Sequence, residues 1–159
     1  MQKNSLKDYI LLAFLSFLGA GFFPFASGTF ASLLTLPLLF LWDFYQLPLF
    51  LFIFLLIILT LLACVTTGPF QEKRKAHDPS WIVIDEVLGM SLCWLFFPTR
   101  DIFSLLIAFV LFRFFDIVKV WPANWFDQKM KHGASVILDD IVSGIYAGFI
   151  YRLAKIYLL

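Results

Sequence analysis

The chain has 159 residues, of which 62% are hydrophobic and 14% are charged, with a formal net charge of +1 and a mean hydropathy of +0.91. Soluble globular domains carry about a quarter charged residues, so this composition predicts an integral membrane protein. The near-neutral charge argues against nucleic-acid binding. No Ser/Gly/Pro-rich linker divides the chain, so we expect a single domain over residues 1–159.

The amino-terminal part predicts a helix that does not span a bilayer. Residues 9–18 form a ten-residue apolar run, shorter than the roughly 20 residues that a spanning helix needs. No small-residue cleavage site ends the run, so we interpret it as an interfacial or re-entrant helix retained in the mature protein. Ser27, Gly28 and Thr29 then precede another apolar stretch. They predict either an ordinary helix cap or a helix start that binds an anion.

The remaining sequence predicts a series of antiparallel helices. Residues 47–66 carry no charge and are long enough to span a bilayer. The segment 68–79 contains Lys73, Arg74 and Lys75 and is assigned to the cytosol, because cytoplasmic loops are rich in Lys and Arg. Asp78 and Pro79 predict the start of a helix over 80–97. Further helices are expected over 102–120 and 134–158, joined by a second cytosolic loop over 121–133. The predicted fold is an all-α, polytopic membrane helical bundle with a re-entrant or interfacial N-terminal segment.

Acidic residues recur near the cytosolic end of three predicted helices, about 8 Å from that end at 1.5 Å per residue. These acids are Asp85, Glu86, Asp116, Asp139 and Asp140. Five neighbouring carboxylates cannot all stay ionised in an apolar medium without a counter-charge. Arg113, Lys119 and a bound divalent cation can supply it, and Mg²⁺ is commonly held by carboxylates together with a substrate phosphate.

Two alternatives remain open at this point. Arg113 and Asp116 are three residues apart and could simply neutralise each other on one helix face, while Lys119 pairs with Asp85 or Asp139. Alternatively, the acids could form the path of a small ion- or proton-coupled transporter.

Two similar segments, DEVLG at 85–89 and DDIVSG at 139–144, each carry acids one turn before a glycine. Such glycines allow two helices to approach closely.

Four segments resemble the phosphatidylglycerophosphatase A family in the family's order: SGTFASLLTLP, DPSWIVIDEVLGM, FRFFDIVKVWP and GASVILDDIVSGIYAG. The resemblance covers nearly all of residues 21–148. Three positions depart from the usual pattern: Ala31 replaces a glycine, Val120 stands where Lys-Pro is common, and Ala134 replaces a second glycine after Gly133. No departure removes an acid, although the 121–133 loop could close differently over a headgroup.

The resemblance implies a Mg²⁺-dependent lipid phosphatase that converts phosphatidylglycerol phosphate to phosphatidylglycerol in the bacterial cytoplasmic (inner) membrane, with its active site facing the cytosol. Together with the acid pattern, it implies a catalytic and metal-binding set of Asp85, Glu86, Asp116, Asp139 and Asp140. The implied phosphate-binding set is Gly28, Thr29, Arg113 and Lys119. The nucleophile, either a water or one of the acids, and the oligomeric state stay open.

Overall fold

The computed structural model describes residues 5–74, 79–98, 101–125 and 133–158. Within these ranges every regular element is helical, which confirms the predicted all-α class. The elements are α1 (Leu6–Leu15), the 3-10 turn η1 (Ala20–Phe22), α2 (Ser27–Phe44), α3 (Leu49–Arg74), α4 (Ile84–Leu95), α5 (Ile102–Val118) and α7 (Gly133–Leu158).

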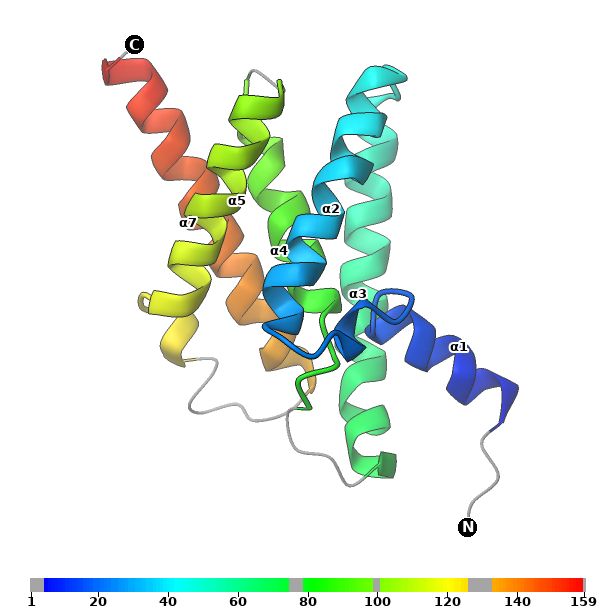
Figure 1. Ribbon diagram of the computed structural model, residues 1–159. Coiled ribbons are helices and arrows are strands. Elements are labelled where there is room, and N and C mark those ends of the chain that lie inside the picture. Colours follow the sequence, from blue (N-terminus) through cyan, green and yellow to red (C-terminus); the bar gives the residue numbers. More distant parts are fainter. Residues whose placement is uncertain (1–4, 75–78, 99–100, 126–132, 159) are drawn as a thin grey trace.

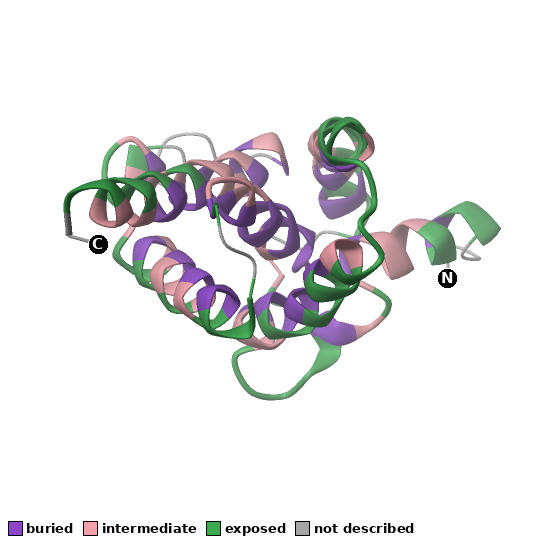
Figure 2. Cartoon of the chain, turned by 90° about the horizontal axis from the view of Figure 1, so that it is seen from above, coloured by how far each residue is buried: buried purple, intermediate pink, exposed green. Residues whose placement is uncertain are grey.

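Helices α2, α3, α4, α5 and α7 run side by side as a bundle, and α1 projects outward beside α3 near its lower end (Figure 1). The helices α2, α4 and α7 begin at that lower end, where α3 and α5 finish. α4 is the central helix, since it packs against α2, α3, α5 and α7. Seen from above, buried residues face the interior of the bundle and exposed residues face outward (Figure 2). One end of the molecule therefore gathers five helix termini.

Three of the described helices, α2, α3 and α7, are long and apolar enough to cross a membrane. α4 and α5 are shorter, with 12 and 17 residues. Many large apolar side chains on the outer faces are exposed, including Phe50 and Val65 of α3 at 75% and 71%. A soluble monomer rarely exposes so much contiguous apolar surface, so these faces suit lipid. The transverse α1 agrees with the predicted interfacial N-terminal helix.

The predicted end of the spanning helix over residues 47–66 was wrong, because α3 continues to Arg74. We had expected residues 68–79 to form a loop from Gly68 onward. Gly68 instead marks a helix crossing: a Cβ atom on Gly133 of α7 would collide with the backbone of Gly68 and Thr67. Pro69 remains inside the helix, as prolines do in membrane helices whose neighbours stabilise the freed backbone groups.

The predicted start of the next helix was also wrong, because α4 begins at Ile84, not at residue 80. Its N-cap is Val83, which provides no side-chain cap. The Val83 N–H donates to the carbonyl oxygen of Leu15 at 3.0 Å, so the end of α1 holds the backbone that leads into α4. Asp78, the predicted cap, lies outside the described residues.

Ser27 does not cap α2, although the sequence favoured a cap there. The N-cap is Ala26, with a left-handed φ of 45°, and Ser27 is the first helical residue. The Ser27 hydroxyl donates to the carbonyl oxygen of Ser80 at 2.5 Å. Its side chain therefore joins the start of α2 to the segment before α4, and this contact positions α2 beside the acids of α4.

Candidate metal and phosphate site

The structure brings three of the five predicted acids together. Asp85 and Glu86 lie in the first turn of α4, Asp140 lies on α7, and one carboxylate oxygen from each falls within 4.8 Å of the other two. Asp85 and Asp140 are buried. We call these three residues the acidic cluster.

Two glycines explain why the acids of α4 and α7 meet. A Cβ atom on Gly89 would collide with the backbone oxygen of Asp140, and one on Gly144 would collide with the backbone of Gly89. The two helices therefore touch backbone to backbone one turn beyond their acids. This close approach is the packing that the similar DEVLG and DDIVSG segments predicted.

Asp116 reaches the same region from α5. Its carboxylate forms an ion pair with the Arg113 guanidinium, with 2.6 Å between Nη1 and Oδ2. The Asp116 carboxylate also lies within hydrogen-bonding reach of the Asp140 carboxyl. Arg113 also lies close enough to Glu86 to interact with its charge. The Arg113 side chain is 16% exposed, so its pairing takes place in a largely dry environment. Asp116 thus joins the acidic cluster to a cation.

Asp139 is paired with the second predicted cation. The Lys119 ammonium lies 2.8 Å from Asp139 Oδ2. Lys119 ends α5 in a left-handed conformation with φ of 47°, which turns the chain out of the helix just where the side chain meets α7. The other Asp139 oxygen accepts from the Asp140 N–H at 3.0 Å. Asp139 therefore holds Lys119 beside the acidic cluster.

The start of α2 lies against the same cluster. Glu86 packs so closely on Gly28 that a Cβ atom there would collide with Glu86 Oε1. The first backbone N–H groups of a helix have no intrahelical partner and carry the positive end of its dipole. Gly28 is buried and Thr29 is half-buried. The structure therefore places Gly28 against the cluster, with Thr29 next to it in the first turn of α2.

These residues fit a divalent cation. No ion pair joins Asp85, Glu86 or Asp140 to a cation within the described ranges, and Glu86 Oε2 is buried without a hydrogen-bond partner there. Burial of an ionised carboxylate is unfavourable unless it is paired or coordinates a metal. Three carboxylates at this spacing offer the oxygen ligands that Mg²⁺ and similar hard cations prefer.

Sequence reasoning missed one ion pair at this end of the bundle. Lys73 at the end of α3 bonds both carboxylate oxygens of Asp8 in α1, at 2.6 and 2.7 Å. Asp8 also accepts from the Ser5 N–H at 2.8 Å, completing a capping box. The S-x-x-D spacing could have revealed the cap, but nothing local could have revealed the partner on α3.

Comparison with known proteins agrees with the geometry. Residues 13–155 match the family described as Phosphatidylglycerophosphatase A. A protein of that name from Escherichia coli is 34% identical over 135 residues, covering 84% of this chain and 77% of the relative. Another from Haemophilus influenzae is 34% identical over 148 residues, covering 92% and 89%. A protein from Bacteroides thetaiotaomicron named "Putative phosphatidylinositol-3-phosphatase" is 31% identical over 142 residues, covering 86% and 88%.

No solved structure matches this chain. The family match spans most of the sequence and includes all four helices that supply the candidate site. The chain belongs to the phosphatidylglycerophosphatase A family.

Proposed function

We propose that this protein hydrolyses the terminal phosphomonoester of phosphatidylglycerol phosphate, releasing inorganic phosphate and phosphatidylglycerol. The observation that carries the proposal is the acidic cluster of Asp85, Glu86 and Asp140, built where helices of an apolar bundle begin. Membership of the family supports the reaction and the lipid substrate. A transporter is not favoured, because the acids gather at one end of the bundle and do not form a path across it.

The acidic cluster is the proposed metal site, and Mg²⁺ is the proposed ion because all its ligands would be oxygens. A bound cation would neutralise charge on the phosphate and polarise its oxygens. Asp116 and Asp139 complete the acidic site. Their further role is to fix Arg113 and Lys119, the cations with which they form ion pairs.

The phosphate would be bound by groups of opposite charge from three helices. Arg113 offers a planar fork of donors and Lys119 a compact ammonium. The free N–H groups at Gly28 and Thr29 add an anion-binding helix start. Hydrolysis forms a bond from a water oxygen to phosphorus and breaks the bond to the lipid oxygen, which takes up a proton. The site's carboxylates are placed to receive the proton that the attacking water loses.

We also propose that the site faces the cytosol of a bacterium. The end of α3, at the same end of the bundle, carries Lys73 and Arg74, in keeping with the excess of basic residues on the cytoplasmic side. A cysteine replacing the exposed Glu72 tests this orientation. It should resist an impermeant thiol reagent in intact cells and react after lysis. Gln71 is unsuitable as a probe, because it is only 8% exposed.

The direct test measures phosphate release by the purified protein in detergent–lipid micelles. Phosphatidylglycerol phosphate, phosphatidic acid and phosphatidylinositol 3-phosphate are compared, each with Mg²⁺ and with excess chelator. We expect the first lipid to be hydrolysed fastest and only with the divalent ion. Full activity in chelator would contradict the metal site, and preference for the phosphoinositide would replace the proposed substrate.

A further inference from the structure

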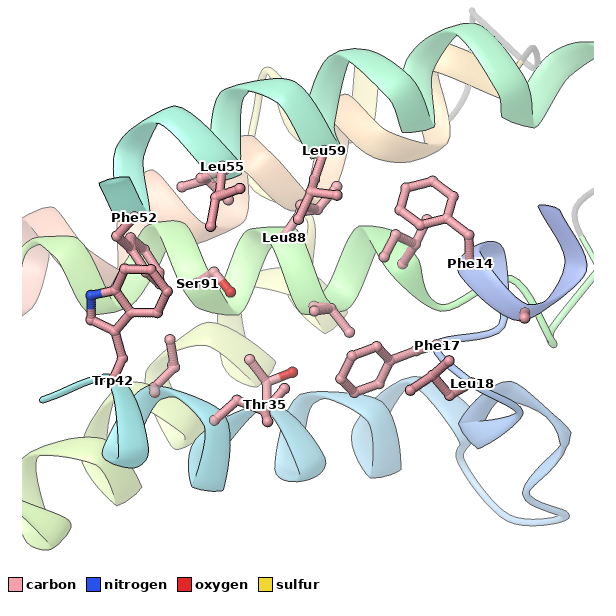
Figure 3. A pocket seen from close by; sticks show the side chains of 16 residues that line it. Phe14, Phe17, Leu18, Thr35, Trp42, Phe52, Leu55, Leu59, Leu88 and Ser91 are labelled. Carbon is pink, nitrogen blue, oxygen red and sulfur yellow. The ribbon is translucent and has the colours of Figure 1, made fainter. Parts of the chain in front are cut away.

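A second feature of the bundle is an apolar groove of about 290 Å³ between α2, α3 and α4. Figure 3 shows its two walls, with Thr35 and Trp42 on α2 facing Phe52, Leu55 and Leu59 on α3. Leu88 of α4 lies between them. An engineered apolar cavity of about 150 Å³ is large enough for benzene, so this groove has room for a longer hydrocarbon.

The groove exists because α2 and α3 pack at one end only. The ring centroids of Trp42 and Phe52 lie 5.2 Å apart, edge to face, close to the turn that joins the two helices. Along the rest of their length the space between them is lined by side chains such as Leu38 and Leu55, which remain 52% and 38% exposed. Since α3 has the length and composition of a membrane-spanning helix, a gap beside it opens to lipid.

The groove and the acidic cluster share the first turn of α4. Ile84, Val87, Leu88 and Ser91 line the groove and repeat at the spacing of one helix face. Asp85 and Glu86, on the other side of that turn, belong to the acidic cluster. The cytosolic end of the groove therefore lies at the same depth as the carboxylates, about one helix diameter, roughly 10 Å, away.

The turn after α1 shapes this end of the groove with an unusual backbone. Phe17 and Leu18 have left-handed φ values of 47° and 55°, which few residues other than glycine adopt. Their side chains lie on one side of the groove end and Phe14 lies on the other (Figure 3). Such strained conformations persist only where the surrounding structure imposes them, and they are common at ligand-binding sites.

We propose that this groove binds one acyl chain of the lipid substrate whose phosphate occupies the acidic site. The inference rests on the proposed function, which supplies a substrate with both a phosphomonoester and acyl chains. The headgroup and glycerol between them contain about ten bonds of roughly 1.5 Å, enough to pass from the groove end to the carboxylates. An acyl chain is already in an apolar solvent in the bilayer, so the groove acts chiefly by orienting the lipid at the site.

The test introduces a bulky side chain into the groove from its α3 wall. Leu55→Trp places a larger ring in the groove, whereas the matched control Ile57→Trp, also on α3 and 54% exposed, does not line it. Each variant is assayed on long-chain phosphatidylglycerol phosphate and on its deacylated, water-soluble headgroup. We expect Leu55→Trp to lower kcat/KM for the long-chain lipid at least about tenfold, mainly through KM. Its activity on the headgroup, and both activities of Ile57→Trp, should stay within about twofold of the parent.

A labelling experiment identifies the occupant directly. Phosphatidylglycerol phosphate with a photoreactive group on one acyl chain should label α3 and α4 in the parent and lose that labelling in Leu55→Trp. Unlabelled phosphatidylglycerol phosphate should compete, and phosphatidylcholine with the same chains should compete poorly. Equal competition would mean that the groove holds any bilayer lipid, which would overturn the proposal, as would equal kinetics for the two tryptophan variants.

The two proposals fail in different ways. A parent that releases no phosphate from either long-chain or deacylated substrate would contradict the proposed function, and the photolabelling would still decide whether the groove holds the chain of a phosphomonoester lipid. A parent that is active, with no difference between Leu55→Trp and Ile57→Trp, would retain the proposed function and contradict the groove.

Discussion

The acids at the lower end of the bundle form two regions with opposite electrostatic character. In the acidic cluster, Asp85, Glu86 and Asp140 converge without an ion pair to a cation among the described residues. At its rim, Asp116 and Asp139 each pair with a cation at 2.6 and 2.8 Å. The two regions are adjacent and share α7, yet among the described residues only the acids of the rim form ion pairs with cations.

This difference separates two roles for residues of one chemical type. A buried ion pair that is already balanced can serve as structure or can hold a cation in place for a ligand. Two buried carboxylates and a half-buried one, none with such a partner, are unfavourable in the absence of a cation. We therefore propose that the cluster is the part of the site that binds a cation, and that the rim is the part that presents positive charge to the phosphate.

The largest expected effect is the loss of one cluster acid. Asp140→Asn keeps the shape but removes a charged ligand, and we expect turnover to fall at least about 10³-fold, the effect of losing about 4 kcal/mol of transition-state stabilisation. Mg²⁺ at about 100 times its Kd should stabilise the parent by about 2.7 kcal/mol, and the variant should lose most of that thermal shift. Phosphate release measures the turnover, and thermal unfolding with and without Mg²⁺ measures the Mg²⁺-dependent stabilisation.

Asp139→Asn is the matched control, since it changes the neighbouring acid on the same helix. It removes the Asp139 carboxylate that pairs with Lys119 but leaves the three cluster carboxylates unchanged. We expect a smaller fall in activity and a retained Mg²⁺-dependent thermal shift. If both variants lost that shift equally, the distinction between the cluster and its rim would be wrong.

A second prediction concerns the cation on the rim. Arg113→Lys keeps the charge but removes the planar fork, and we expect turnover to fall at least about tenfold if Arg113 contacts the phosphate. The double variant Arg113→Leu with Asp116→Leu should remain folded and be inactive. Turnover of Arg113→Lys within twofold of the parent would make Arg113 a structural partner of Asp116 and leave Lys119 as the principal phosphate ligand.

A third prediction uses the close contact between α2 and the cluster. In Gly28→Ala the new Cβ atom meets the end of the Glu86 side chain, which can rotate away, so the protein should fold. The carboxylate would move from its place in the cluster, and we expect activity to fall about tenfold with weaker Mg²⁺ affinity. Activity is measured over a range of Mg²⁺ concentrations.

Gly148→Ala provides the control for a glycine in tight packing away from the cluster. Its Cβ would meet the ring of Phe96, so it should lower stability by about 1 to 3 kcal/mol, the typical effect of overpacking. The Mg²⁺ affinity should be unchanged. If Gly28→Ala likewise lowered stability and left the Mg²⁺ affinity unchanged, Gly28 would be a packing residue without influence on the metal site.

Sequence alone predicted the meeting of α4 and α7, because helical spacing fixes what happens within one element. Acids one turn before Gly89 and Gly144 indicated two helices in close contact with their carboxylates at one depth, and the backbone contact between these glycines agrees. Charge counting also identified Arg113 and Lys119 as the available cations. The three-residue spacing also indicated the Arg113–Asp116 pair. The sequence left open whether Lys119 pairs with Asp85 or Asp139, since that depends on how the helices are rotated.

The start of α2, the end of α3 and the start of α4 were not predicted, because contacts between distant segments set them. Ser27 resembled a cap, but its hydroxyl bonds to Ser80. Gly68 resembled a helix end, but it accommodates Gly133 of α7. α4 starts late because the Val83 N–H bonds to Leu15. The apolar groove escaped prediction for the same reason, since an apolar residue facing a gap has no distinct sequence pattern.

The smallest expected effect comes from an ion pair of the same type placed outside the site. Lys73 contacts Asp8 at 2.6 Å, much as Lys119 contacts Asp139 at 2.8 Å, but it joins α1 to α3 away from the cluster. Lys73 is 46% exposed on its side chain, and exposed ion pairs contribute little to stability. We expect Asp8→Asn to change turnover less than about twofold, whereas Asp139→Asn should reduce it more.

The hydrogen bond from Lys73 lowers the pKa of Asp8 below its ordinary value of 3.8, and this direction fixes the pH dependence. A carboxyl whose pKa is lower in the folded state stabilises that state at pH values above its unfolded pKa, and the stabilisation is lost as the pH falls through the folded pKa. The docking of α1 should therefore be constant from about pH 5 to 8 and weaken only below the ordinary Asp pKa. Labelling of a cysteine at Tyr9, which is exposed on α1, reports detachment of α1 by a change in rate. At each pH this rate is compared with that of the same cysteine in Asp8→Asn, because the thiolate fraction itself changes with pH. The ratio of the two rates should be constant from pH 6 to 8, and a ratio that changed there would show that another group controls this contact.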